Sequence, residues 1–217
     1  MLPKIILHIG CSLDGRIDWL KFDNFVYYRV IQNWDVHGML SGSNTMLAAE
    51  MSEEDNISKL NDQYLIVVDS KGRINNWEVI KRQAYWNEHP IVLCSEITPK
   101  RYLDYLHALE IHPLVFGQRH VDLRSALEAV YDQFEVKVIR VDSGGILAGV
   151  LLREGLVDEV STVISPQLTG GVSPKSIFVS QDLASYDEVI DLELIKNEVV
   201  DNHYVHLYYR VKGKADL

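Results

Sequence analysis

The sequence VDSGGILAGVLLREGLVDE, residues 141–159, carries the signals of a strand end, a tight turn and a helix in one short span. An apolar run at 136–141 alternates in the way that predicts a strand, and Asp142 follows it. Gly144 and Gly145 come next, where the absence of Cβ atoms lets the backbone approach a neighbour or a ligand closely. The segment therefore predicts a strand that ends on a carboxylate and a glycine pair.

A helix is predicted to begin at about Ile146, and Gly155 is typical of the residue that ends a helix. Residues 156–164 then read as the next strand. A helix that begins at glycines directs its first N–H groups and the positive end of its dipole toward an anion. The same pattern also occurs as a plain strand-to-helix connection, so spacing alone leaves phosphate binding and simple turn geometry both open.

Composition limits the class of protein. With 217 residues, 47% of them hydrophobic, the chain can bury a sizeable core, and we expect a single domain over residues 1–217. The net charge of −10 argues against a nucleic-acid or acidic-membrane partner, since a polyanion would be repelled. No signal peptide or long apolar run is present, which indicates a cytoplasmic location. Cys11 and Cys94 lack metal-ligand spacing, so two buried thiols and no metal site are expected.

Short β-rich runs alternate with amphipathic segments along the chain. The predicted strands lie at 5–9, 37–40, 64–69, 91–94, 112–116 and 136–141, and the predicted helices at 25–34, 45–51, 99–109 and 123–134. Two alternating runs, 188–196 and 203–212, with Asp201–Asn202 between them, predict a terminal hairpin. We therefore expect an α/β fold with a mixed, mostly parallel central sheet, helices on both faces and a C-terminal antiparallel hairpin.

Loops rich in small residues follow four of the predicted strands. Ligands of open α/β sheets gather at the carboxyl ends of strands, and together such loops can hold a long, polyphosphorylated ligand. Each loop alone is also explained by turn chemistry. The loops are 10–17, 41–45, 69–73 and 142–149. In the second of them, Ser43 or Asn44 could be the N-cap of the helix that follows.

Charged and aromatic side chains accompany these loops. Arg16, Lys71 and Arg73 could meet a ribose 2′-phosphate, although surface charge alone would also account for any one of them. Trp19, Tyr27 and Tyr28 follow the first loop and could form a wall for a nicotinamide or another flat heterocycle, with core packing the alternative.

Four segments carry a family resemblance. They read SLDGR at 12–16, SGSNTML at 41–47, IVVDS at 66–70 and GGILAGVLLREGLVDEVSTVISPQLTGG at 144–171. With these segments in this order, the chain resembles the reductase domain of the bifunctional riboflavin-biosynthesis deaminase/reductase, which has the dihydrofolate-reductase fold. The deaminase half, with its zinc-binding His and Cys pattern, has no counterpart in this sequence.

The resemblance implies hydride transfer from NADPH to the ribose of 5-amino-6-(5-phosphoribosylamino)uracil. Asp142 falls where the family has a substrate-contacting glutamate and is the expected catalytic carboxylate, with a helix-cap role as the alternative. Asn33 and His8 align with an arginine and a lysine that serve the substrate. The positions that match cofactor-binding residues are Gly10, Ser41, Gly42, Thr45, Ser70, Gly144, Gly145, Ile146, Leu147, Ala148 and Gly149.

The sequence departs from the family after residue 47. Paired aspartates, a proline and Leu-Thr-Val-Arg are usual there, whereas 48–55 read AAEMSEED. Loss of the arginine, together with Asn33 and His8 in place of cations, weakens the case for a phosphorylated substrate. It does not affect the case for NADPH.

The leading interpretation is thus an NADPH-dependent pyrimidine reductase acting on a small molecule. The alternatives are a related reductase of another substrate, such as a pterin, and a non-catalytic nucleotide-binding protein. Binding of NADPH without turnover would distinguish the last. A homodimer is expected from the resemblance and from the apolar residues of 156–168, which could form a strand beside another chain.

Overall fold

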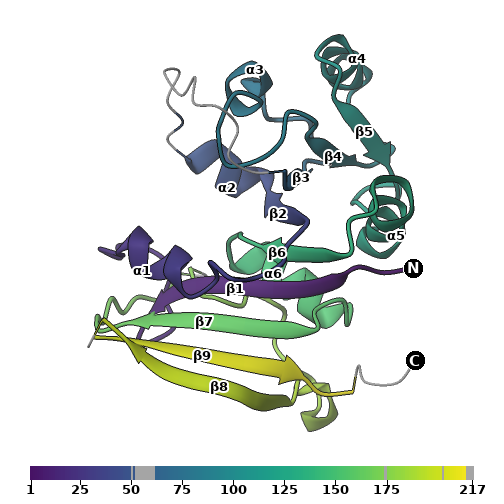
Figure 1. Ribbon diagram of the computed structural model, residues 1–217. Helices are drawn as coiled ribbons and strands as arrows, with labels where there is room; N and C mark the ends of the chain where they lie inside the picture. The colour runs from purple at the N-terminus through teal and green to yellow at the C-terminus, as the bar shows by residue number, and fades with distance from the viewer. Residues whose placement is uncertain (50, 52–61, 174, 202, 214–217) are drawn as a thin grey trace. The chain divides into compact units, whose positions relative to one another are not determined.

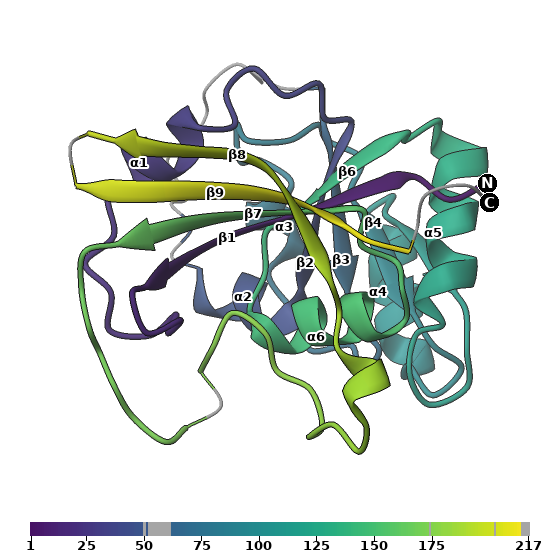
Figure 2. The same cartoon turned by 90° about the horizontal axis from the view of Figure 1, so that it is seen from below.

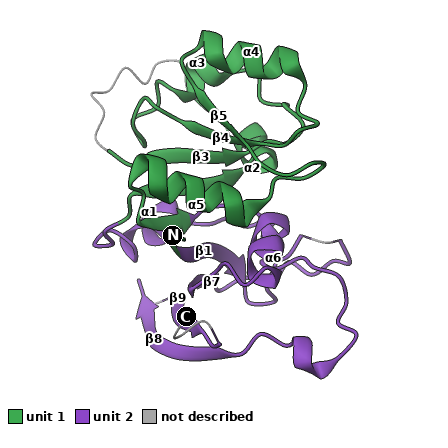
Figure 3. Cartoon of the chain, turned by 90° about the vertical axis from the view of Figure 1, so that its right-hand side faces the viewer, with its two compact units in different colours: residues 1–4, 36–140 green, residues 5–35, 141–217 purple. Residues whose placement is uncertain are grey.

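The computed structural model describes residues 1–217 except 50, 52–61, 174, 202 and 214–217. Most of the acidic run at 50–55 and one residue of the predicted hairpin turn therefore lie outside the described residues. The chain divides into two compact units, each built from separate segments (Figure 3). Unit 1 comprises Met1–Lys4 and Val36–Arg140, and unit 2 comprises Ile5–Asp35 and Val141–Leu217. A single domain over 1–217 stays a prediction.

Unit 1 alternates strands and helices. Its strands lie in the order β5, β4, β3, β2, β6, and the neighbours from β2 to β5 are parallel. The strands are β2 (Gly38–Gly42), β3 (Tyr64–Val68), β4 (Ile91–Cys94), β5 (His112–Val115) and β6 (Val138–Val141). The helices are α2 (Ser43–Ala48), α3 (Trp77–Ile80), α4 (Lys100–Ala108) and α5 (Leu123–Phe134).

The core of unit 1 surrounds Trp77, which is fully buried. Leu65 and Val67 of β3 and Leu106 of α4 belong to the same apolar cluster, so α3 and α4 share one face of these strands. Ile66, between them in β3, is also fully buried. A strand buried on both faces explains the continuous apolar run that predicted β3.

Unit 2 holds four of the described strands, in the order β1, β7, β9, β8. Strands β1 and β7 are parallel, whereas β9 is antiparallel to both β7 and β8. Figure 1 shows the predicted hairpin beside β7, and Figure 2 shows α1 and α6 on opposite sides of these strands. The elements are β1 (Lys4–Ser12), α1 (Asn24–Arg29), α6 (Gly145–Arg153), β7 (Glu159–Ser165), η1 (Tyr186–Glu188), β8 (Leu192–Val200) and β9 (Tyr204–Val211).

Most predicted elements are confirmed, with shifts at their ends. Helix α1 ends at Arg29 rather than Trp34, and α3, only one turn long, was missed because four residues show no clear period. Strand β7 pairs with β1 on one side and β9 on the other. It therefore has no open edge for a strand of a second chain, and the expectation that 156–168 lies beside another chain's surface stays a prediction.

The prediction of two buried thiols is confirmed. Cys11 and Cys94 are buried free thiols, and burial raises the pKa of Cys11 to about 11 and that of Cys94 to about 12. Among the helices of the described ranges, none combines the length and the hydropathy that a membrane crossing requires.

Candidate functional site

The glycine-rich helix α6 forms as its sequence predicts. Gly144 is its N-cap, with extended backbone, and Gly155 follows the helix with a φ of 63°. The amide of Leu156 donates to the carbonyl of Leu151 at 2.9 Å, and Gly155 donates to Leu152 at 3.1 Å. These two bonds form a Schellman motif, which requires the left-handed conformation that glycine adopts without strain.

Two glycines of α6 have a packing role that the sequence did not reveal. A Cβ on Gly145 would overlap the carbonyl oxygen of Ser176, and a Cβ on Gly149 would overlap that of Val179. The amide of Val179 donates to the Gly145 carbonyl at 3.0 Å. Residues 176–179 can therefore lie directly against α6 only because these two positions lack side chains.

Gly144 differs from these two glycines. The nearest atom to a Cβ placed there is Cδ1 of Ile17, at 3.8 Å, an ordinary van der Waals distance. Its own neighbourhood therefore accepts a side chain. Two of the predicted phosphate-binding glycines, Gly144 and Gly145, start α6. A substitution at Gly144 can test ligand binding without disturbing the packing of α6, whereas one at Gly145 cannot.

Asp142 lies between β6 and α6 and is partly buried. The hydroxyl of Tyr27, from α1, lies 3.0 Å from Asp142 Oδ1 and also 3.0 Å from the backbone oxygen of His8. Helix α1 begins at an N-cap, Asp23, whose side chain accepts from the amide of Phe25 at 2.8 Å. The sequence indicated Tyr27 as part of an aromatic wall, and the structure adds a polar contact to the expected catalytic carboxylate.

His8 is fully buried, and both of its ring nitrogens have partners. Nδ1 lies 2.9 Å from Ser161 Oγ, and Nε2 lies 3.1 Å from the backbone oxygen of Tyr27. Ser161 Oγ lies 2.8 Å from His206 Nε2, and His206 Nδ1 lies 2.9 Å from Glu198. We call His8, Ser161, His206 and Glu198 the polar row. Direct contact of His8 with substrate stays a prediction, and it would require one of these bonds to break.

Two further predicted positions of unit 2 are placed differently. Asn33 is exposed in the turn after α1. The ring of Phe22 packs against Gly10. Its nearest atoms lie 2.9 Å from the position that a Cβ on Gly10 would take, so an aromatic side chain occupies the space next to this glycine. The cofactor role of Gly10 and the substrate role of Asn33 stay predictions.

In unit 1, β2 leads through Ser41 and Gly42 directly into α2. The N-cap is Gly42, not Ser43 or Asn44 as expected, and no side chain caps this helix. Ser43 and Asn44 instead accept hydrogen bonds from the guanidinium of Arg73, at 2.5 and 2.7 Å. Both acceptors are neutral, so these bonds leave the positive charge of Arg73 uncompensated.

Asp69 fixes the loop that carries Ser70 and Arg73. Its Oδ2 accepts from the amides of Arg73 and Ile74 at 2.7 and 3.0 Å, and from the Tyr102 hydroxyl at 3.0 Å. Burial, together with Asp69, raises the pKa of Tyr102 far above its usual range, although a hydrogen bond from Trp77 opposes the rise. Tyr102 therefore stays a neutral donor, and Asp69 remains an ordered anchor beneath the loop.

Arg16, another predicted phosphate ligand, is engaged within unit 2. It is only 8% exposed, its guanidinium donates to the backbone oxygen and hydroxyl of Ser173, and Asp18 lies 3.5 Å away. Arg16 thus anchors the segment around Ser173. Of the predicted cations that follow β1 and β3, Arg73 has the side-chain environment that better suits an anion.

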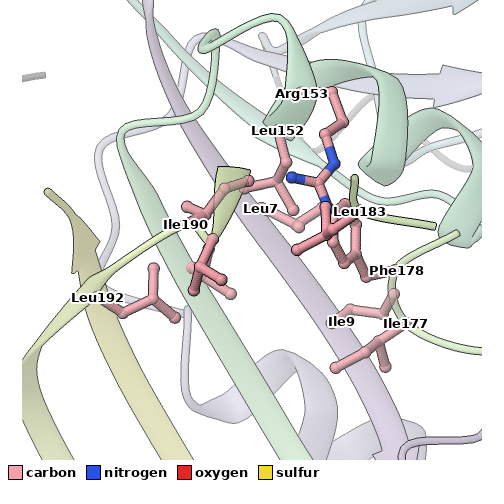
Figure 4. A pocket seen from close by; sticks show the side chains of 11 residues that line it. Leu7, Ile9, Leu152, Arg153, Ile177, Phe178, Leu183, Ile190 and Leu192 are labelled. Atoms are coloured by element: carbon pink, nitrogen blue, oxygen red, sulfur yellow. The ribbon is translucent and has the colours of Figure 1, made fainter. Parts of the chain in front are cut away.

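Unit 2 also contains an apolar cavity of about 330 Å³, shown in Figure 4. Leu7, Ile9 and Val160 line it, and they alternate along their strands with His8 and Ser161. The cavity therefore lies on the face of these strands opposite the polar row, and none of the predicted site residues lines it. The other lining residues are Leu152, Arg153, Ile177, Phe178, Leu183, Val189, Ile190 and Leu192.

Comparison with known proteins settles the family. Residues 3–206 match the family model of the RibD C-terminal domain. The chain belongs to this family. A 2,5-diamino-6-ribosylamino-4(3H)-pyrimidinone 5′-phosphate reductase of Methanothermobacter thermautotrophicus is 25% identical over 98% of this chain and 100% of the relative. The Escherichia coli riboflavin biosynthesis protein RibD is 26% identical over 77% of this chain and 49% of its own length.

Solved structures show the fold of this RibD C-terminal domain chain. Acinetobacter baumannii RibD superposes with a TM-score of 0.72 at 19% identity, over 97% of this chain and 58% of that one. The Saccharomyces cerevisiae riboflavin biosynthesis reductase Rib7 gives a TM-score of 0.65 at 20% identity, over 97% and 90% of the two chains. These likenesses confirm the predicted reductase-domain fold.

Proposed function

We propose that this protein is an NADPH-dependent reductase of a ribosylaminopyrimidine 5′-phosphate in riboflavin biosynthesis. The observation that carries the proposal is Asp142 at the start of α6, hydrogen-bonded to Tyr27 at 3.0 Å, in a chain that matches the RibD C-terminal domain family over residues 3–206. A carboxylate held at the end of a strand and beside a helix N-terminus suits contact with a polar ligand.

The names of the relatives change which of two pyrimidines is the first candidate substrate. The sequence favoured the uracil compound, whereas two relatives, including one matched over its full length, are named for the 2,5-diamino pyrimidinone. A Thermotoga maritima structure is named for the uracil compound, at 16% identity. The two compounds differ in the substituent at ring carbon 2, an amine or an oxygen. We propose the diamino compound as the first candidate and the uracil compound as the second.

NADPH would supply the hydride that reduces the sugar carbon. In unit 1, Arg73 fits the 2′-phosphate, because its two side-chain partners are neutral and it forms no ion pair among the described residues. In unit 2, Gly144 fits a phosphate at the start of α6, since a Cβ there would meet only Ile17, at an ordinary contact distance of 3.8 Å. The remaining cofactor positions implied by the family stay part of this proposal.

Asp142 would act on the ribose. Its carboxylate can accept a hydrogen bond from a sugar hydroxyl and can stabilise positive charge that develops as the ring opens. Tyr27 fixes one carboxylate oxygen by donating to it, which limits the rotation of the side chain. Positioning, rather than proton transfer, is the role we assign to Tyr27.

The decisive assay follows NADPH oxidation with the diamino pyrimidinone, the uracil compound and dihydrofolate as parallel substrates. Oxidation with either pyrimidine and not with dihydrofolate supports the proposal. Reduction of dihydrofolate alone would make the protein a pterin reductase. Binding of NADPH without oxidation in any arm would support the non-catalytic alternative, which the missing arginine after residue 47 favours.

A further inference from the structure

The polar row crosses all four strands of unit 2. His8 stands on β1, Ser161 on β7, His206 on β9 and Glu198 on β8, and hydrogen bonds of 2.8–2.9 Å join each to the next. Strand register explains this alignment. His8 pairs directly with Ser161, and Glu198 pairs directly with His206. His206 pairs with Val163, two positions from Ser161 on β7, so Ser161 and His206 are diagonal neighbours on one face. The two histidines are 0% and 2% exposed.

The ends of the row are both acceptors. At one end, Nε2 of His8 meets the backbone oxygen of Tyr27, which can only accept. At the other end, Nδ1 of His206 meets the Glu198 carboxylate. The pKa of Glu198 is lowered by hydrogen bonds from Lys196 and His206, which keeps this carboxylate ionised and accepting.

With both imidazoles neutral, the row is one hydrogen short. The row contains four hydrogen bonds, and each needs one hydrogen. Two neutral imidazoles and one hydroxyl supply one hydrogen each, which leaves one bond without a donor. A further proton on either imidazole satisfies every bond, because the Ser161 hydroxyl can then accept from that ring and donate to the other.

We propose that the polar row holds one proton beyond two neutral imidazoles, paired with Glu198, and that the row in this state positions Tyr27 on Asp142. The second part rests on the role proposed for Asp142. It extends that role to three buried side chains, those of His8, Ser161 and His206. His8 thus becomes a positioning residue, in place of the direct substrate contact that the sequence suggested.

His8 contacts Tyr27 at both ends, although its backbone oxygen shares the single hydroxyl hydrogen of Tyr27 with Asp142. Its Nε2 lies 3.1 Å from the Tyr27 backbone oxygen, its own backbone oxygen lies 3.0 Å from the Tyr27 hydroxyl, and the two rings lie 4.2 Å apart. A neutral row would lose one bond, and the loss would fall on buried groups, where an unpaired polar atom is costly. Loosening His8 would therefore loosen Tyr27.

Other charged and titratable groups surround the row. Lys196 donates to Glu198 from β8 at 2.8 Å, and Arg29 of α1 pairs with Asp201 at 2.8 Å. Glu159 of β7 accepts from Tyr208 of β9, whose ring stacks 6.2 Å from His206. Burial, followed by the bond to Glu159, raises the pKa of Tyr208 well above its usual range, so Tyr208 stays neutral through the pH range of interest. Glu198 is thus the carboxylate that bonds directly to the row, while Asp142 meets it through Tyr27 and Glu159 lies behind Tyr208.

The proton count is tested by ¹⁵N NMR of the imidazoles in the free protein, without substrate or cofactor. At pH 7 we expect one histidine of the row with both nitrogens protonated. In Glu198→Gln the side-chain amide can donate to His206 Nδ1, so the row needs no extra proton and we expect two neutral rings. Glu193→Gln, on the exposed part of the same strand, is the control and should leave the spectrum of the row unchanged. Two neutral imidazoles in the unmodified protein would overturn the proposal.

The positioning role is tested with Ser161→Ala, which breaks the row at its centre. We expect kcat to fall on the order of tenfold, with the KM for NADPH changing less than twofold, because a misplaced Tyr27 disturbs Asp142. We also expect faster amide exchange in α1, a measurement that needs no activity. We expect the kcat of the unmodified protein to fall as the pH rises and the row loses its extra proton. In Glu198→Gln, where the row needs no extra proton, this fall should be smaller. Unchanged α1 exchange in Ser161→Ala overturns the positioning role, even if the wild-type protein reduces neither pyrimidine.

Discussion

The hydroxyl of Tyr27 lies 3.0 Å from Asp142, although 115 positions separate the two residues in the sequence. The bond joins α1 to the turn that precedes α6. It gives the expected catalytic carboxylate a fixed partner outside its own loop, which a simple helix-cap role would not require. Loss of this bond should therefore affect catalysis more than folding.

Replacing Asp142 by Asn should lower kcat on the true substrate on the order of tenfold or more, because the charge that meets the sugar is lost. Tyr27→Phe should lower kcat by a smaller factor with the same substrate. Steady-state kinetics and an NADPH fluorescence titration measure the two effects. Tyr28→Phe, at the exposed neighbouring position, is the control. If Asp142→Asn loses cofactor binding together with turnover, the carboxylate only shapes its loop.

Gly144→Val and Gly145→Val should differ. At Gly144 a Cβ meets its nearest neighbour, Ile17, at an ordinary 3.8 Å, so the variant should fold and lose NADPH affinity because the valine occupies the phosphate site. At Gly145 it meets the Ser176 backbone, so the variant should lose thermal stability before any binding effect can be read. Melting curves and NADPH titration separate the two. Normal affinity in a folded Gly144→Val protein would contradict phosphate binding at this helix.

Arg73→Ala should weaken NADPH binding on the order of tenfold and leave NADH binding unchanged, because only NADPH carries the 2′-phosphate. The ratio of the two dissociation constants is the quantity to measure. Arg101→Ala, on the exposed side of α4, serves as the control. An equal loss for both cofactors would assign Arg73 to the loop structure rather than to the phosphate.

Asp14 should contribute a pH-dependent stability. Its pKa is lowered to about 2 by a hydrogen bond from Ser12 and by the amides of Gly170 and Thr169. A lowered pKa means that the folded state prefers the ionised form, so this stability is present above about pH 4 and is lost as the pH falls toward 2. The free energy of unfolding of Asp14→Asn, measured by denaturation at several pH values, should fall less between pH 5 and 2 than that of the wild type. If the free energies of unfolding of the two proteins fall in parallel with pH, Asp14 does not make this contribution.

A homodimer is expected from the family resemblance, with a mass of about twice 24.8 kDa by light scattering. Strand β8, not β7, ends the strand order, and its Leu194 and Val199 are 49% and 69% exposed. Val199→Asp should lower the mass, whereas Leu168→Asp, exposed in the segment after β7, should not. A concentration-independent mass of about 24.8 kDa in the wild type would exclude the dimer.

Local signals predicted the elements well because they depend on near neighbours. The period of apolar residues located α5 at Leu123–Phe134 and β4 at Ile91–Cys94 with their observed ends. Gly155 ended α6 as expected, since the capping bonds of this motif stay within a few residues. The N-cap of α2 was misplaced, because Ser43 and Asn44 turn their side chains to Arg73 instead. A competing partner about thirty positions away is not visible in a local pattern.

By itself, the sequence determined the α/β order of elements, the glycine helix start and Asp142 as the carboxylate beside it. Tertiary structure alone decided which side chains meet. His8 reaches Ser161 across 153 positions, and Ser161 reaches His206 across 45. These meetings depend on strand register, because a shift of one residue would turn each side chain to the opposite face of the sheet. Register is set by pairing between distant segments, and for that reason the polar row and its extra proton follow only from the folded chain.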